Sequence, residues 1–330
     1  MENSTTKTPQ QNDWSNLSDG LRSNLNIVTL TIAVLSVILN LLVISVTYTK
    51  KERLSLFKWT ILKLAVCDFV YSCILIYLQI VLMKNTGLSH SYQCYILAAS
   101  RVIINVQVGI VLIIAVERFL VVVYPLKNFL TNRFVIILEL LNILIALAVT
   151  LPVVIVAKLE TIMGQATCVA DWPRRKTDSK LYQWINVCLY LALPVVFLIP
   201  LFLVMGLTLR SQAKRVESHV NKVQAEKRAK ENRRIIFILF LILLFFICLT
   251  ALWRLGYLPL DYDTSLISPS SFMYMMTIFN LHLIVNPIIY WMADATWRRD
   301  AKKFLTCCKV ASAPKNEAIS STLPGVNGFN

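Results

Sequence analysis

Seven long apolar segments constrain the fold of this chain more than any other feature of its sequence. A helix needs about 20 apolar residues to cross the roughly 30 Å hydrocarbon core of a bilayer. The segments are long enough, covering residues 26–48, 56–82, 92–124, 132–157, 182–209, 234–258 and 272–293. Charged residues make up only 15% of the chain, too few to coat a soluble protein. Because the segments lack the alternation of barrel strands, we expect an all-α membrane protein with a seven-transmembrane helix bundle.

Basic residues are concentrated in every second connection. The segments 49–58, 125–133, 210–233 and 294–330 carry more than twice as many Lys and Arg residues as the segments on the other side. Positive charge favours the cytoplasmic side, so we expect a multi-pass protein of the plasma membrane with its N-terminus outside and its C-terminus inside. This placement explains the net charge of +15 without a nucleic-acid partner. The expected divisions are an extracellular tail over 1–25, the helix bundle over 26–293, a short amphipathic helix on the inner leaflet over 294–308, and a disordered cytoplasmic tail over 309–330.

Cysteines and sequons fit the same orientation. Cys94 lies at the outer end of the third segment and Cys168 in the long outer connection after the fourth, so both face an oxidising compartment and we expect a disulfide. Two sequons in the outer tail predict glycosylation, at Asn3 and Asn16. Two cysteines after the amphipathic helix are placed for palmitoylation, Cys307 and Cys308. Ordinary thiols near a membrane are the alternative interpretation of this last pair.

Polar side chains inside the apolar segments are the candidate functional residues, because they are costly at bilayer depth unless they are paired or hydrated. Asp68 lies midway along the second segment. Helical spacing places two sets on common faces, Ser100, Gln107 and Arg118 on the third segment and His282, Asn286 and Tyr290 on the seventh. Asp68 opposite an Asn and a Gln would suit a hydrated polar network or a small cation. The alternative is a hydrogen-bond cluster that only fixes helix packing.

These residues, in this order on seven segments, resemble the rhodopsin-like (class A) G-protein-coupled receptors over residues 26–308. The matching features are Asn40, the Leu-Ala-x-x-Asp motif ending in Asp68, Glu117-Arg118-Phe119, Pro152, Pro200, Asn286-Pro287-Ile288-Ile289-Tyr290, Cys94 with Cys168, and the amphipathic helix with its cysteines. Each motif alone is weak evidence. Together, on seven segments, they are a specific signal for a receptor.

The resemblance implies a role for each matching residue. Arg118, held by Glu117 at rest, would engage a heterotrimeric G protein, with Phe119 completing the motif. Asp68 and Asn286 would form the mid-bundle site at which such receptors often hold sodium. The implied activation network comprises Asn40, Asp68, Gln107, His282, Asn286, Pro287 and Tyr290, of which Tyr290 would swing inward. The resemblance also implies arrestin and a receptor kinase as partners, in addition to the lipid bilayer.

Several positions depart from the family pattern. Asn142 stands where the fourth span usually has Trp, and Thr208 stands where the fifth has an activating Tyr, eight residues after Pro200. Leu249 and Ala251 replace the usual Trp and Pro of the sixth span, which removes the proline kink that usually accompanies its outward swing.

Two further substitutions lie around the implied sodium site. Gln107 and His282 replace smaller or amide groups there. Glu117 and Phe119 are common variants of the usual Asp and Tyr.

The residues of the predicted ligand pocket disfavour two receptor classes, those for amines and those that sense light. Ser100 occupies the position of the Asp in amine receptors, and residues 272–293 contain no Lys for a retinal Schiff base. Arg101 and Arg254 lie instead at comparable depth in the outer half and could hold a carboxylate or phosphate. The residues expected to contact the ligand are Ser100, Arg101, Ile104, Arg254 and Tyr257.

Each arginine has an alternative role. Arg254 could snorkel to the outer interface beside Trp253, and Arg101 could pair with Glu160. The anionic-ligand hypothesis puts a peptide first and an acidic lipid, nucleotide or metabolite second.

Two other classes of function are disfavoured. A transporter or channel would be indicated by inverted repeats or Gly-rich broken helices, which the sequence lacks. An enzyme is disfavoured because no His-Glu-x-x-His pattern is present among the three histidines. We expect no cofactor.

Overall fold

The computed structural model describes residues 19–49, 56–84, 92–124, 131–162, 165–170, 175–216, 269–293 and 295–311, together with Pro173 and helical pieces between 236 and 254. Within these residues, six helical segments are long and apolar enough to cross a membrane. They match six of the seven predicted spans, and the helical pieces between 236 and 254 lie in the remaining one. The predicted helical membrane bundle is confirmed.

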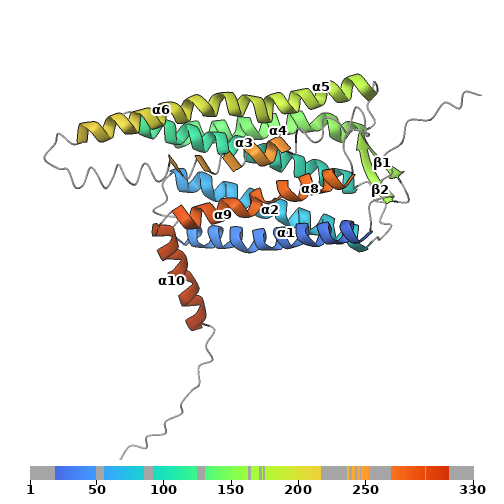
Figure 1. Cartoon of the computed structure of the whole chain (residues 1–330), viewed down its shortest axis with the longest axis horizontal. Helices are drawn as coiled ribbons and strands as arrows, with labels where there is room; N and C mark the ends of the chain where they lie inside the picture. The colour runs from blue at the N-terminus through green and yellow to red at the C-terminus, as the bar shows by residue number, and fades with distance from the viewer. Residues whose placement is uncertain are drawn as a thin grey trace, which may run out of the picture.

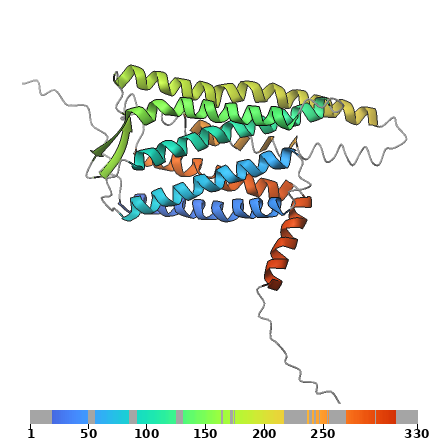
Figure 2. The ribbon, with the colours of Figure 1, turned by 180° about the vertical axis from the view of Figure 1, so that it is seen from behind.

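The first four spans are single helices that run side by side (Figures 1 and 2). They are α1 (Asp19–Tyr48), α2 (Leu56–Lys84), α3 (Tyr92–Val123) and α4 (Asn132–Val156). Thr131 caps α4, since its hydroxyl accepts from the backbone N–H of Phe134 at 3.3 Å. Large apolar side chains cover the outside of the bundle, where Leu144 is 62% and Ile155 73% exposed. Such a surface is stable in lipid rather than in water.

A short antiparallel hairpin follows α4, formed by β1 (Ala157–Ile162) and β2 (Gln165–Ala170). It lies at one end of the bundle, and α10 (Ala295–Ala311) leaves the opposite end at a steep angle (Figure 1). We call these the hairpin end and the α10 end. Trp291 and Trp297 pack edge to face where α10 begins, with ring centroids 5.8 Å apart. The predicted amphipathic segment is therefore helical and continues to Ala311.

The fifth span contains a π-turn that the sequence pattern did not predict. It consists of α5 (Arg175–Val187), the π-helical turn η3 (Cys188–Ala192) and α6 (Leu193–Val216). Pro194 follows this turn and is buried, whereas Pro200 is exposed.

The seventh span is broken into α8 (Pro269–Phe279) and α9 (His282–Ala293). The break lies at Asn280–Leu281, where tight bonds such as Leu281 N–H to the Ile278 carbonyl (3.0 Å) replace α-helical ones. Pro287 lies inside α9. Because proline has no N–H, it leaves the carbonyl of Leu283, four residues earlier, without its helical partner.

Candidate functional site

A polar network around Asp68 occupies the middle of the bundle. Asp68 is fully buried. Its Oδ1 accepts from Gln107 Nε2 on α3 at 2.7 Å, and its Oδ2 accepts from Asn286 Nδ2 on α9 at 3.0 Å. Three helices are thereby joined through one carboxylate. Of the predicted network, Asp68, Gln107 and Asn286 are thus brought into contact.

The network continues into α1, where it satisfies the carbonyl that Pro287 leaves free. Asn40 Nδ2 donates to the Leu283 carbonyl at 3.0 Å, and the Ser36 hydroxyl donates to it at 3.2 Å. Ser36 and Ser72 share a hydrogen bond of 2.7 Å. The sequence indicated Asn40 and Pro287 separately, but their connection through a backbone carbonyl was not predicted.

His282 and Tyr290 lie on α9 beside this network. Nδ1 of His282 lies 2.6 Å from the Phe279 carbonyl, and its ring packs on that of Phe279 with centroids 4.6 Å apart. The position of His282 therefore stabilises the break between α8 and α9. Tyr290 is 7% exposed, and its hydroxyl has no hydrogen-bond partner among the residues that the structure describes.

The motif Glu117-Arg118-Phe119 lies near the α10 end of α3. Glu117 is buried, and its Oε1 accepts from the Thr60 hydroxyl on α2 at 3.0 Å. Arg118 is half-buried and attracts Glu117 electrostatically. Phe119 packs beside the apolar cluster that joins Val122 to α6. Thr60 was not among the predicted site residues, since a hydroxyl in a span gives a weak sequence signal.

An ion pair joins α2 to α4 near this motif. Lys63 Nζ contacts both carboxylate oxygens of Glu139, at 2.6 and 2.5 Å. The Lys63 side chain is 40% exposed on the outside of the bundle, against 14% for Glu139. Sequence reasoning missed this pair, although two charges inside apolar segments were a usable signal.

A second polar cluster lies closer to the hairpin end, around Arg254. The guanidinium donates through Nη1 to Asn186 Oδ1 at 2.8 Å and through Nη2 to Asn105 Oδ1. Its Cζ lies 5.1 Å from the centroid of the Tyr190 ring, within the range of a cation–π contact. Arg254 is only 6% exposed. The snorkelling alternative is therefore wrong, because the side chain is directed into the bundle.

The other predicted ligand contacts differ in their surroundings. Arg101 is half-buried and close enough to repel Arg254 electrostatically. The Ser100 hydroxyl donates to the carbonyl of Leu97 at 2.7 Å, and Ile104 is 2% exposed within an apolar cluster. Tyr257, Trp253 and Glu160 lie outside the described side chains.

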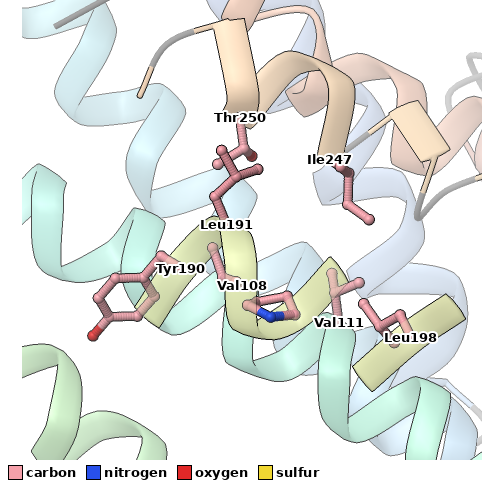
Figure 3. Close-up of a pocket in the computed structure, with 8 residues that line it drawn as sticks. Val108, Val111, Tyr190, Leu191, Leu198, Ile247 and Thr250 are labelled. Carbon is pink, nitrogen blue, oxygen red and sulfur yellow. The ribbon is translucent and has the colours of Figure 1, made fainter. Parts of the chain in front are cut away.

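A small pocket lies beside the Arg254 cluster, between α3, η3 and the sixth span (Figure 3). Figure 3 shows Thr250 and Ile247 of the sixth span facing side chains of the π-turn and α6. The lining residues are Val108, Val111, Tyr190, Leu191, Pro194, Leu198, Ile247 and Thr250. The π-turn thus presents Tyr190 both to this pocket and to Arg254. By contrast, Phe245 of the sixth span is 47% exposed.

Asn142, which stands where the fourth span usually has Trp, connects α4 to α3 through a hydrogen bond and a close contact. Its Nδ2 donates to the Val106 carbonyl at 2.9 Å. A Cβ built on Gly109 would lie 1.9 Å from Asn142 Oδ1. Only glycine therefore allows this close approach.

The described residues include only some of the predicted disulfide, palmitoylation and glycosylation sites. Cys94 is disulfide-bonded, while the side chain of Cys168 lies outside the described part of the chain, so the pairing stays a prediction. The backbone of Cys307 and Cys308 is helical, but their side chains are not described. The sequons at Asn3 and Asn16 also fall outside the described residues.

The chain matches a protein family model, although it matches no individual curated protein. A search of the curated proteins finds none that matches the chain. The family model of the 7 transmembrane receptor (rhodopsin family) matches residues 39–290, well over half of the sequence. The match covers Asp68, the Glu117-Arg118-Phe119 motif and Asn286 to Tyr290. The chain therefore belongs to the rhodopsin family of seven-transmembrane receptors.

Proposed function

We propose that this chain is a plasma-membrane receptor that binds an extracellular ligand through an anionic group and activates a heterotrimeric G protein. The hairpin end would face outward and the α10 end the cytosol, as the distribution of basic residues favours. The observation that carries the proposal is the position of Arg254, buried inside the bundle in the half nearer the hairpin.

Neutral side chains position the Arg254 guanidinium. Its hydrogen bonds to Asn105 and Asn186 hold the guanidinium between α3 and α5. Guanidinium groups form paired hydrogen bonds with carboxylates and phosphates, and these bonds are stronger than those between neutral groups. An anionic group that reached Arg254 and Arg101 would also relieve their mutual repulsion.

Binding of an anionic group at Arg254 would change the contacts among three helices of the bundle. Arg254 belongs to the sixth span, Asn105 to α3 and Asn186 to α5. An anion that competes with either asparagine for the guanidinium changes the ties among these three helices. The chain lacks the usual Trp and Pro of the sixth span, and this cluster supplies another connection between ligand and helix positions.

A peptide with an acidic residue or a free C-terminal carboxylate is the preferred ligand, and an acidic lipid, nucleotide or metabolite is the alternative. The basic run Arg174-Arg175-Lys176 and the acidic Asp261 and Asp263 lie in predicted outer connections, where they would offer a peptide complementary charges. At the α10 end, Arg118 would engage the G protein, and arrestin and a receptor kinase would act on the same face.

The test is a screen of peptide and acidic-metabolite libraries on cells that express the chain with a promiscuous Gα subunit. Any agonist is then applied to Arg254→Met, Arg101→Gln and Arg118→Ala. We expect all three variants to reach the cell surface and to lose the response. Arg22→Gln, which changes an exposed arginine near the start of α1, is the matched control and should respond normally. An unchanged dose–response curve in Arg254→Met would refute the anchor.

A further inference from the structure

The carboxyl group of Asp68 is buried at mid-depth, so its surroundings must satisfy both of its oxygens. Family resemblance implies a sodium ion at this position. A hard cation prefers carboxylate, carbonyl and water oxygens as ligands. The fit of the site to sodium therefore depends on which atoms face the two carboxylate oxygens.

Amide nitrogens face both of these oxygens. Gln107 Nε2 lies 2.7 Å from Oδ1, and Asn286 Nδ2 lies 3.0 Å from Oδ2. An N–H group directs its positive hydrogen at the carboxylate and repels a cation. The separation of 2.7 Å also leaves no room for an ion between Gln107 and Oδ1.

The orientation of the Gln107 amide is determined by this contact. A flipped amide would bring its oxygen against the carboxylate, so that two acceptors would face each other. Gln107 is fully buried, and its Oε1 has no hydrogen-bond partner among the described residues. The amide therefore directs its N–H group to Asp68, and its Oε1 has no partner among the described residues, which indicates that this donation dominates.

Nearby hydroxyl groups also use their hydrogens within the protein. The Ser72 hydroxyl donates to the Asp68 backbone carbonyl at 2.6 Å, and Ser36 bonds to Ser72 and to the Leu283 carbonyl. Asn40 directs its nitrogen, not its oxygen, at Ser36 and Leu283. Both oxygens of the Asp68 carboxylate therefore face donors that occupy the place of a cation.

We propose that Gln107 takes the place of the sodium ion in this receptor, as a permanent internal partner of Asp68. The stability of the receptor does not then respond to sodium, and the tie between α2 and α3 persists at every salt composition. This inference does not depend on the proposed ligand, because its readout is the folding of the purified chain.

The experiment compares thermal unfolding of the purified full chain in sodium chloride and in choline chloride at equal ionic strength. We expect no sodium-specific shift for the wild type. Gln107→Ser, which shortens the side chain and supplies a hydroxyl oxygen, should unfold about 3 °C higher in sodium at concentrations well above the dissociation constant. In Gln107→Ser/Asp68→Asn this gain should disappear.

Asn105→Ser is the matched control, since it removes an amide two residues away that contacts Arg254 and not Asp68. It should acquire no sodium response. Gln107→Asn serves as a second variant if Gln107→Ser does not fold. A sodium-specific stabilisation of the wild type overturns the proposal, and so does the absence of a sodium response in both folded Gln107 variants.

Discussion

Asp68 and Arg254 are an acidic and a basic side chain buried in two regions of the same bundle, and both are held by neutral amides from two other helices. Asp68 accepts from the nitrogens of Gln107 and Asn286, whereas Arg254 donates to the oxygens of Asn105 and Asn186. The α3 helix contributes to both, through residues that are two positions apart and therefore on different faces.

The two regions differ in the kind of group that their side chains suit. Both oxygens of Asp68 are occupied by donors from the protein, which suits a structural tie. The Arg254 guanidinium has five N–H groups in a planar fork, a geometry that matches a carboxylate or a phosphate. The Asp68 network is therefore suited to holding helices together, and the Arg254 cluster is suited to receiving an anionic group.

The largest expected difference comes from removing one amide of each region. Gln107→Met leaves Asp68 Oδ1 without a donor and should cost about 3 kcal/mol of unfolding free energy. Asn105→Leu should cost about 1.5 kcal/mol, because Arg254 keeps Asn186 and the Tyr190 ring. Thermal or chemical unfolding of the purified variants measures both values. A larger loss in Asn105→Leu than in Gln107→Met would reverse the comparison.

A smaller effect is expected from the contact that fixes α3 between the two regions. In Gly109→Ala the new methyl group displaces Asn142, so α3 must move or the hydrogen bond to Val106 must break. We expect a loss of about 2 kcal/mol in unfolding free energy.

The double variant Gly109→Ala/Asn142→Ala supplies the control for this prediction. Removing the Asn142 amide makes room for the methyl group, so the double variant should be more stable than Gly109→Ala alone. If Gly109→Ala is as stable as the wild type, the result would contradict the steric contact that we infer between residue 109 and Asn142.

The ion pair between Lys63 and Glu139 offers a third way to balance charge, with ionic partners at the edge of the bundle. Lys63→Met leaves the less exposed Glu139 alone and should cost about 1 kcal/mol. Lys63→Met/Glu139→Leu should return close to wild-type stability, because the pair is removed as a unit. A double variant less stable than Lys63→Met would show that the pair stabilises the fold beyond balancing its own charges.

The smallest expected change in stability comes from Thr60→Val, which removes the hydrogen bond to Glu117. The loss should be about 1 kcal/mol or less. Thr60→Val should affect signalling more than stability, because the attraction between Glu117 and Arg118 then becomes the main interaction of the Glu117 side chain. Basal nucleotide exchange on a G protein is the measurement, and we expect it to change while surface expression stays normal.

The sequence predicted the spans and the residues of the Asp68 network because both depend on strong signals. Apolar length defines a span, and a carboxylate at bilayer depth requires partners. The pairing of Asp68 with Gln107 and Asn286 followed from helical faces. Which atom of each amide faces the carboxylate did not follow, because orientation depends on the local geometry of hydrogen bonds.

The fifth span was less predictable for a physical reason. A π-turn inserts one residue into the helix, so the face on which each later residue lies shifts by about 100°. The sequence did not distinguish the buried Pro194 from the exposed Pro200. Asn186 and Tyr190 were also not identified as partners of Arg254.

The direction of Arg254 was also left open by the sequence. A lone arginine near the end of a span can reach the interface or the interior. Its burial depends on acceptors from α3 and α5 that only the assembled bundle brings together.

The central claim is that Arg254 binds a negatively charged group of the ligand. The most direct measurement compares an agonist that has a carboxylate with its matched carboxamide, on the wild type and on Arg254→Gln. The wild type should prefer the carboxylate by about 100-fold in potency, and Arg254→Gln should respond to the two nearly equally. A variant that keeps the full preference for the carboxylate would contradict the account.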